Sequence, residues 1–432
     1  MNLVKIKGKT RNLFRSDLAR DTLWMLISKL FNVVMQAGYF IIVARVLGAE
    51  NYGSFIGVTA LASILFPFIA LGSEHILIKY VSTDKSLFKT YWGNTLVLLL
   101  GNSLAIIAVL LILSPLIFAN NISLISIFLI LLSDLLCLGL LDISYKALIA
   151  NARVDKSAQM GILSTCGKLL AALSLAVFFK NPDTNTWAYL YFIASVIMAA
   201  IAIILVTKLA GYPRPVFSKL KSNIRQGIYF SISASAQNIN ANLDKTMLAS
   251  LSGLSATGIY GSAYRFIDVG NVLLLALSGA TYTRFFQHGA SGIKSSLGFA
   301  KRLFPMISLY AVVSVVGYLI FAPFIPVVLG AEYQDAIAAL RWLAPLPAIA
   351  AFQYLAADTL TGAGHQKARS FVQVSAAIFN ILLNLWLIPL YSWKGAAWAT
   401  LISDSLRLVC LWIILFLIYR QDSQCQHSQG KK

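Results

Sequence analysis

One stretch near the middle of the chain, SISASAQNINANLDK at 231–245, carries polar side chains inside an otherwise apolar run. Ser233, Gln237, Asn240 and Asp244 recur there at the spacing of one face of an α-helix. Such amide and hydroxyl groups can hydrogen-bond to sugar hydroxyls in a wet cavity, or they can join neighbouring helices. The density of polar residues favours the cavity, and Gln237 and Asn240 are candidate substrate ligands.

A thinner polar stripe lies near the N-terminus, where Lys29, Asn32, Gln36 and Tyr39 also recur at helical spacing. Asn32 and Gln237 occupy matching positions if the chain repeats itself. We therefore add Asn32 and Gln36 to the candidate substrate ligands, with hydrogen bonding between helices as the alternative.

Cationic side chains within apolar runs form a second group of candidates. A charge at the bilayer centre costs at least about 2.5 kcal/mol, so it faces water, a partner or a ligand. Arg265 with Asp268, and Asp404 with Arg407, can neutralise each other at i,i+3, whereas Lys168 has no acid three or four residues away. Candidate cations for an anionic substrate are Lys29, Lys168, Lys245, Arg265, Arg341 and Arg407.

Acids in apolar runs are candidates for coupling transport to an ion. A carboxyl group that gains and loses water as a cavity opens can bind and release a proton. Asp134, Asp244 and Asp358 are the candidates. Each can instead be structural, and Asp134 can instead form a salt bridge with Lys168.

Prolines in the apolar runs predict broken helices. Proline lacks an N–H group and interrupts the helical hydrogen-bond ladder, and carbonyl groups freed at membrane depth need a cavity or a neighbouring helix. Pro67, Pro345 and Pro347 are the candidate hinges.

Catalytic, metal and nucleotide motifs are not evident in the sequence. The four histidines are scattered, and Gly8-Lys9-Thr10 lacks the earlier glycine of a P-loop. Short loops leave no room for catalytic groups on a water-exposed face. We therefore expect a non-enzymatic protein without metal or cofactor. We also expect no nucleic-acid partner, because basic cytoplasmic loops explain the net charge of +19.

The composition places these residues in a membrane protein. The chain is 58% hydrophobic and 12% charged over 432 residues, against about 45–50% and 25% in soluble domains. A membrane-spanning helix needs about 20 residues, so about twelve helices fill the chain. The expected spans are 22–44, 51–73, two in 90–145, 158–179, 184–207, 226–250, 259–283, 303–331, 336–362, 370–393 and 395–419.

Basic residues gather in alternate connections, which predicts that both termini are cytoplasmic. Three pairs of similar segments, including ARVLGAENYGSF (44–55) and ASLSGLSATGIYGSA (249–263), indicate two parallel six-helix repeats. Gly48 and Gly253 align within this pair, and the other pairs follow in the same order at nearly the same offset. The expected organisation is a cytoplasmic basic segment (1–21), a six-helix bundle (22–207), a cytoplasmic linker (208–225), a second bundle (226–419) and a cytoplasmic polar tail expected to be disordered (420–432).

The segments SKLFNVVMQAGYFIIVARVLGAENYGSF (28–55), LDKTMLASLSGLSATGIYGSAYRF (243–266) and LAADTLTGAGHQKARSFVQVSAAIFNILLNLWLIPLY (355–391) resemble polysaccharide flippases of the Wzx type. The resemblance covers essentially the whole chain. It implies the all-α MATE-like fold of the MOP superfamily, with two six-helix bundles around a central cavity.

The resemblance also implies a function. Such flippases move undecaprenyl-pyrophosphate-linked O-antigen units from the cytoplasmic to the periplasmic leaflet of the bacterial inner membrane. Proton or sodium is the expected coupling ion, membrane lipids surround the protein, and polysaccharide polymerase and chain-length machinery are possible partners. The alternative is a MATE-type multidrug or metabolite cation antiporter, and a third reading is a non-transporting membrane scaffold.

Overall fold

The computed structural model describes residues 3–119 and 121–429, and side chains between 31 and 422 except those of 120, 219, 222 and 233. All regular structure in the described residues is helical, as the long apolar runs predict. Contacts between residues divide the chain into two compact units. The first unit contains the chain up to Leu47 together with Val58–Asn238, and the second contains Gly48–Gly57 together with the chain from Ile239 onward.

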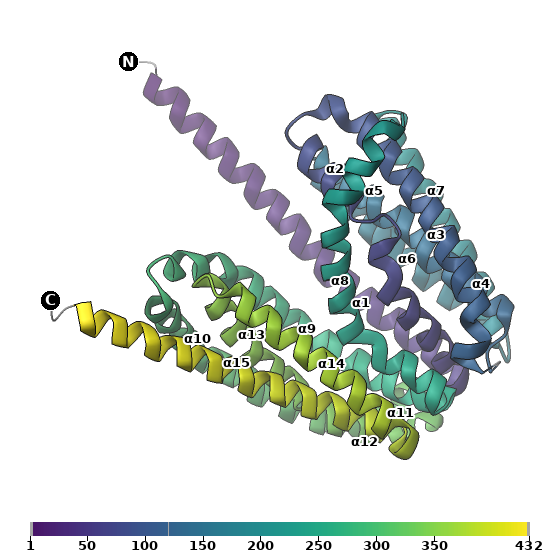
Figure 1. Ribbon diagram of the computed structural model, residues 1–432. Helices are drawn as coiled ribbons and strands as arrows, with labels where there is room; N and C mark the ends of the chain where they lie inside the picture. Colours follow the sequence, from purple (N-terminus) through teal and green to yellow (C-terminus); the bar gives the residue numbers. More distant parts are fainter. Residues whose placement is uncertain (1–2, 120, 430–432) are drawn as a thin grey trace. The chain divides into compact units, whose positions relative to one another are not determined.

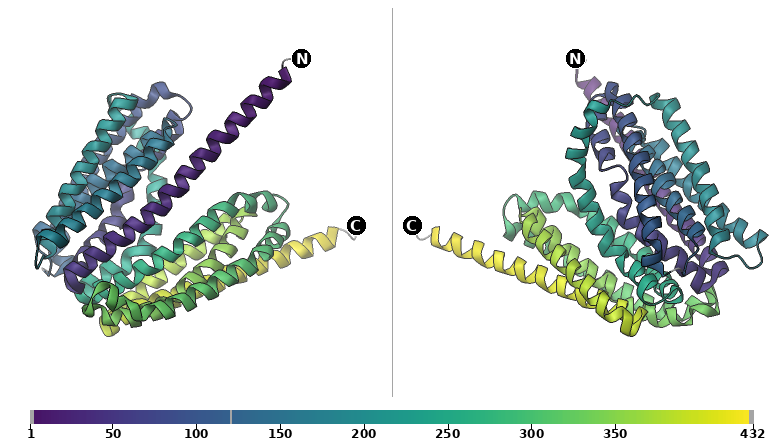
Figure 2. Two further views of the ribbon diagram at one scale, coloured as in Figure 1. Left: turned by 180° about the vertical axis from the view of Figure 1, so that it is seen from behind. Right: turned by 45° about the vertical axis from the view of Figure 1, so that its right-hand side comes forward.

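The first unit is a bundle of helices seen from two sides in Figures 1 and 2. Within it, α2 packs against α3 and α5, and α6 packs against α7. Its elements are α1 (Leu3–Leu65, except for the segment in the second unit), α2 (Ser73–Val81), α3 (Phe88–Phe118), α4 (Leu124–Leu131), a π-helical segment (Leu132–Cys137), α5 (Leu138–Ala150), α6 (Val154–Phe178), α7 (Thr184–Ala210) and the first part of α8 (Leu220–Leu251).

The second unit is built around α13. This helix packs against α9, α10 and α15, and α14 packs along α15. Phe285, Phe299 and Leu355 belong to a buried cluster at these contacts. Its further helices are α9 (Leu254–Gly289), α10 (Ile293–Phe321), α11 (Ile325–Leu329), α12 (Gln334–Leu343), α13 (Leu346–Gly362), α14 (Gln366–Tyr391) and α15 (Trp393–Gln429).

Ten segments of the described chain are long and apolar enough to cross a membrane. The first, Phe31–Phe68, contains two helices because Gly48 is non-helical. α8 is too polar to be counted among the ten, although it is 32 residues long. With these two the helical segments match the twelve predicted spans. The chain is a multi-pass membrane protein.

The structure differs from the expected organisation in the C-terminal tail. α15 continues to Gln429, so the expectation of a disordered tail is wrong over 420–429; polarity ends the membrane span there, but not the helix. The two compact units have other boundaries than the two predicted bundles. Residues 48–57 belong to the second unit, and residues 220–238 belong to the first. The assignment to bundles at 22–207 and 226–419 stays a prediction.

Corresponding turns of the two predicted repeats have similar backbone conformations. Gly48 (φ 74°, ψ 172°) and Gly253 (φ 151°, ψ 162°) each separate two helices with a backbone that favours glycine. In a second pair of similar segments, ALIANARVDKSA (147–158) and TLTGAGHQKARS (359–370), Ala152 and Gly364 both have positive φ. The backbone N–H of Arg153 donates to Leu148 O over 2.9 Å, and that of His365 donates to Leu360 O over 2.8 Å.

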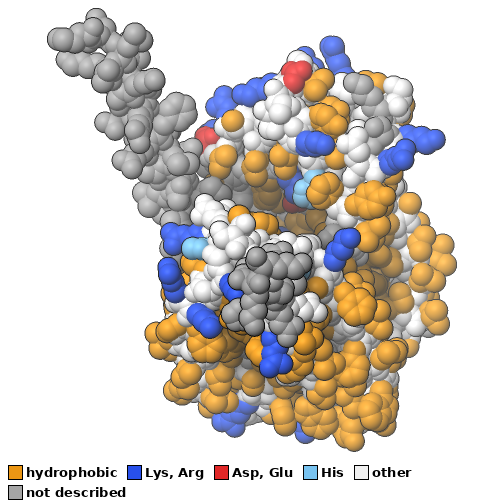
Figure 3. Space-filling model, turned by 60° about the vertical axis from the view of Figure 1, so that its left-hand side comes forward, with side chains coloured by type: hydrophobic (Ala, Val, Ile, Leu, Met, Phe, Trp, Pro, Cys, Tyr) orange, Lys and Arg blue, Asp and Glu red, His pale blue; other side chains and the backbone are white. Residues whose placement is uncertain are grey.

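Hydrophobic side chains cover much of the surface in Figure 3, whereas Lys and Arg side chains gather in a few places on it. Large exposed residues include Ile112, Leu116, Val177 and Phe178, which are 73–82% exposed to solvent. A soluble protein rarely exposes such continuous apolar surface, and lipid is its natural environment.

Candidate functional site

The helix break at Pro67 explains two of the polar residues in the segment 231–245 of α8. Proline has no N–H group, so the carbonyl of Ser63, four residues earlier, loses its helical donor. Asn238 Nδ2 donates to that carbonyl over 2.7 Å, and Ser235 Oγ donates to Ile64 O over 2.8 Å. These two residues lie beside the stripe of Ser233, Gln237, Asn240 and Asp244, and they join neighbouring helices.

The residues of the stripe itself differ in burial. Gln237 is exposed, Asn240 is half-buried and Asp244 is buried, and the side chain of Ser233 lies outside those described. Substrate binding by Gln237 and Asn240 stays a prediction.

In the first unit, Tyr191 links an acid and a base predicted to be functional. Its hydroxyl donates to Asp134 Oδ1 over 2.6 Å, and this contact is buried. Lys168 Nζ lies 5.5 Å from the centre of the same ring, within the range of a cation–π interaction. The phenol therefore connects α6 to the π-helical segment through α7.

Asp134 lies in the π-helical segment Leu132–Cys137. A π-turn widens a helix locally and is frequent at functional sites. The segment interrupts the ladder between α4 and α5, and nothing in the sequence pattern indicates it.

The polar stripe of α1 also faces α6 and α7. Thr165 Oγ1 donates to Asn32 Oδ1 over 2.6 Å. The rings of Tyr39 and Trp187 lie 5.8 Å apart, and those of Trp187 and Tyr191 lie 5.6 Å apart. An aromatic chain thus leads from α1 to the Asp134–Tyr191–Lys168 cluster. Gln36 is exposed, and the side chain of Lys29 lies outside those described.

In the second unit, Asp244 and Lys245 form a buried pair next to two tyrosines. Tyr260 Oη donates to Asp244 Oδ2 over 2.6 Å, and Lys245 Nζ lies 3.6 Å from Asp244 Oδ1. Lys245 Nζ also lies 4.0 Å from the ring centre of Tyr264. A carboxylate, an ammonium group and phenol rings therefore meet in each unit.

A second ion pair lies on α15. Arg407 Nη2 is 3.0 Å from Asp404 Oδ1, which confirms the predicted i,i+3 pairing. The same nitrogen donates to Gln353 Oε1 over 2.5 Å, while Gln353 Nε2 donates to the Asp404 carbonyl over 2.6 Å. Arg265 lies on α9 and is exposed.

Asp358 and the remaining candidates lie apart from these clusters. Asp358 is buried; it pairs with Arg369 Nη1 over 3.4 Å and accepts from Ser278 over 3.0 Å. Arg341 is exposed in the last turn of α12. Helix α12 ends at Leu343 and α13 begins at Leu346, so the expected break around Pro345 and Pro347 is present. Movement at these prolines stays a prediction.

Sequence reasoning missed the neutral partners, which are Tyr191, Tyr260, Tyr264 and Gln353. It also missed an ion cluster in the first unit. Lys146 Nζ lies 2.8 Å from Asp142 Oδ2 and 3.5 Å from Glu74 Oε1. The predicted spans end at residues 73 and 145, directly before Glu74 and Lys146, so the sequence places both residues in loops. Among the described residues, no group of three His, Cys, Asp or Glu side chains could hold a metal ion.

A protein-family model described as "Polysaccharide biosynthesis protein" matches residues 18–288. The chain belongs to this polysaccharide biosynthesis protein family. The match covers the first unit from residue 18 onward, all of α8 and nearly all of α9, and so includes both the Asp134–Tyr191–Lys168 and the Asp244–Lys245 clusters.

Relatives of this chain include an uncharacterized membrane protein, MJ1375, of Methanocaldococcus jannaschii. It is 23% identical over 92% of this chain and 98% of its own length. An inward-facing multidrug resistance MATE family transporter of the MOP superfamily has a similar fold, with a TM-score of 0.70, 14% identity, and coverage of 91% of this chain and 96% of its own.

Two further structures share the fold. The lipid II flippase MurJ in an inward closed conformation has a TM-score of 0.63 and 15% identity, with 93% of each chain covered. A MOP superfamily transporter from Pyrococcus furiosus, described as having a binding pocket of reverse polarity, has a TM-score of 0.60 and 14% identity, covering 93% of this chain and 96% of its own. The MATE-like fold expected from the sequence is confirmed.

Proposed function

We propose that this protein is a flippase for lipid-linked oligosaccharides. The family match over residues 18–288 carries the proposal. A structure with the same fold is the lipid II flippase MurJ, so this architecture can accommodate a flippase for a lipid-linked sugar.

The interior charges are consistent with such cargo. A pyrophosphate must cross a low-dielectric region, and fixed cations lower that cost. Lys168 and Lys245 each lie against a tyrosine ring, where an ammonium group is held by a weak interaction. These two ammonium groups are the candidates to bind the pyrophosphate during its passage.

The specific cargo proposed is an undecaprenyl-pyrophosphate-linked O-antigen unit, moved from the cytoplasmic to the periplasmic leaflet of a bacterial inner membrane. Proton or sodium coupling through Asp134 or Asp244 is part of this proposal. Polysaccharide polymerase and chain-length machinery are the proposed partners that receive the flipped unit.

The second candidate is a MATE-type multidrug or metabolite cation antiporter. It is favoured by the buried carboxylates of Asp134 and Asp244, because an organic cation needs acidic ligands. The two functions differ in the charge of the cargo, so removing one cation separates them. Loss of Lys168 weakens a flippase for anions and leaves a cation exporter intact.

The experiment uses proteoliposomes that contain a fluorescent polyprenyl-pyrophosphate-linked saccharide. Lys168→Ala should assemble normally and lose translocation, while Lys168→Arg retains part of it. Lys180→Ala, which removes an exposed lysine of the same unit, is the matched control and should leave translocation unchanged. If Lys168 is only a salt-bridge partner of Asp134, Lys168→Ala should mainly lower abundance, and removing Asp134 as well should restore it. Absence of translocation by the unaltered protein, together with export of an organic cation, would support the antiporter.

A further inference from the structure

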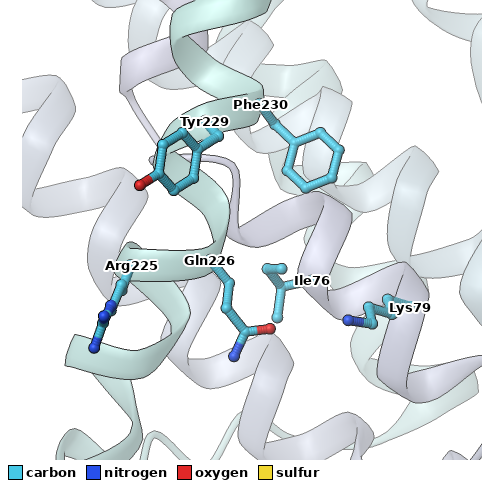
Figure 4. Close-up of a pocket in the computed structure, with 6 residues that line it drawn as sticks. All are labelled: Ile76, Lys79, Arg225, Gln226, Tyr229 and Phe230. Carbon is cyan, nitrogen blue, oxygen red and sulfur yellow. The ribbon is translucent and has the colours of Figure 1, made fainter.

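A pocket between α2 and α8 lies within the first unit and outside the clusters described above. It is lined by Ile76, Lys79, Arg225, Gln226, Tyr229 and Phe230 (Figure 4), and we name it the α2–α8 pocket. Its volume is about 570 Å³, within the range of about 300–1,000 Å³ for small-ligand sites. The space is therefore larger than a single phosphate ion needs.

Two cations line this pocket from opposite helices. Figure 4 shows Lys79 on α2 extending toward α8, and Arg225 on the far side of Gln226. Both side chains are exposed, and no carboxylate among the described residues pairs with either of them. Lys79 Nζ lies 5.3 Å from the ring centre of Tyr80. Ammonium and guanidinium groups without a carboxylate partner are strong ligands for phosphate oxygens. The pocket is therefore suited to an anion.

The upper wall of the pocket is aromatic. Tyr229 is 73% exposed and Phe230 is 50% exposed. The Phe230 ring is stacked on His75, with their centres 4.9 Å apart, so its orientation is held from behind. Both rings offer an apolar face and Tyr229 adds a hydroxyl group, which suits a ligand that has both an apolar face and hydroxyl groups. A sugar ring has both.

The backbone fixes the distance between the two walls. A Cβ atom at Gly227 would lie 2.2 Å from Leu71 O, and one at Gly72 would lie 2.1 Å from Gly227 O. Two glycines thus allow α8 to approach the break before α2 closely. The segment before α8 is also attached, since Asn94 Oδ1 accepts from the backbone N–H of Val216 over 2.7 Å. These backbone contacts fix the positions of the two helices that line the pocket.

We propose that the α2–α8 pocket binds the pyrophosphate and first sugar of the lipid-linked substrate before translocation, an inference that rests on the proposed flippase function. Lys79 and Arg225 hold the phosphates, and Tyr229 and Phe230 stack on the sugar. Basic connections predict that this end of α2 and α8 is cytoplasmic, which is the leaflet in which the proposed substrate is made. An anionic phospholipid shares the phosphate chemistry but has no sugar ring for the aromatic wall.

Binding is measured by native mass spectrometry in nanodiscs of phosphatidylcholine. The probes are polyprenyl pyrophosphate with one sugar, polyprenyl pyrophosphate alone, and phosphatidylglycerol. The double variant Lys79→Gln/Arg225→Gln should bind both pyrophosphate probes at least about tenfold more weakly, because two charge-assisted contacts are lost. Tyr229→Leu/Phe230→Leu should weaken the sugar-bearing probe alone. Lys85→Gln/Lys221→Gln removes two exposed lysines that do not line the pocket and should bind all probes like the unaltered protein.

Size-exclusion chromatography and circular dichroism check that the variants are folded. Unchanged binding of the pyrophosphate probes by the Lys79/Arg225 variant, in a protein that still translocates substrate, overturns the pocket and leaves the proposed function standing. Equal binding of phosphatidylglycerol, lost in the same variant, overturns the assignment to the substrate. Failure of the unaltered protein to translocate any lipid-linked saccharide overturns the proposed function, whatever the pocket binds.

Discussion

Gly53 and Gly258 each lie against the backbone at the start of the other residue's helix. A Cβ atom at Gly53 would come within 1.7 Å of Leu254 O, and one at Gly258 within 1.9 Å of Ala49 O. Positions 49 and 254, like 53 and 258, are separated by the same offset as the repeat glycines 48 and 253. The helices that follow these two glycines therefore cross in a pseudo-symmetric contact of backbone on backbone.

This crossing predicts that alanine is destabilising at both glycines. The added Cβ meets a carbonyl group, which no side-chain rotation can move, so Gly53→Ala and Gly258→Ala should each lower the free energy of unfolding by about 1–3 kcal/mol. The measurement is unfolding in mixed detergent micelles. Gly101→Ala on α3 is the control, because nothing lies within 4 Å of its new Cβ, and it should be neutral or stabilise the helix by up to about 1 kcal/mol. Equal stability of all three variants would contradict the contact.

The second prediction concerns the carbonyl of Ser63. Asn238→Leu removes its donor and should cost about 1–3 kcal/mol, the penalty for an unpaired buried polar group. Pro67→Ala supplies a backbone N–H at the position from which a helix normally donates, so Asn238→Leu should cost less in that background. The double-mutant cycle measures this coupling. Asn242→Leu changes another half-buried amide on the same helix, and its cost should not depend on Pro67.

Much of the fold follows from the sequence because its causes are local. Apolar length defines the spans, Pro67 ends α1, and glycine provides the backbone at positions 48 and 253. The polarity of residues 420–432 does not predict their structure correctly, because a polar sequence can still form a helix. Residues such as Arg420 and Gln421 are good helix formers, so α15 continues beyond the apolar run.

The partners in the candidate site were less accessible to sequence reasoning. Tyr191 and Tyr260 lie in apolar runs, where an aromatic residue is as easily explained by packing against lipid or core. Their hydroxyl groups become informative only when a carboxylate from another helix lies 2.6 Å away. The π-helical turn that carries Asp134 results from tertiary packing, and helical periodicity does not reveal it.

The third prediction concerns Asp183, the N-cap residue of α7, which directly precedes the membrane span Thr184–Ala210. Asp183 accepts from the side chain of Thr186 over 2.7 Å and from its backbone N–H over 2.9 Å, and these hydrogen bonds lower the pKa of Asp183 below its usual value. A lowered pKa in the folded state stabilises the protein above the unfolded value of about 3.9, and this stabilisation is lost as the pH falls through the folded value.

Asp183→Ala should therefore lower the free energy of unfolding at neutral pH by about 1 kcal/mol, the usual cost of losing an N-cap. Asp183→Asn is the matched control, because asparagine also caps helices but does not titrate. The stability difference between the unaltered protein and Asp183→Asn should shrink as the pH is lowered below about 4. A difference that is the same at pH 3 and pH 6 would rule out this origin of the pKa shift.

The last prediction separates structure from transport at Asp244 and Lys245. Lys245→Met leaves the buried Asp244 carboxylate with Tyr260 but without its ammonium partner, and removal of one member of a buried ion pair costs about 3–5 kcal/mol. Asp244→Asn/Lys245→Met removes both charges and should recover most of that stability. Lys394→Met, at an exposed lysine of the same unit, controls for loss of a lysine and should be neutral. If the pair is only structural, the double variant also recovers translocation in proteoliposomes. If Lys245 binds the cargo, the double variant is stable and inactive, and this outcome would place the ammonium group of α8 on the path of the substrate.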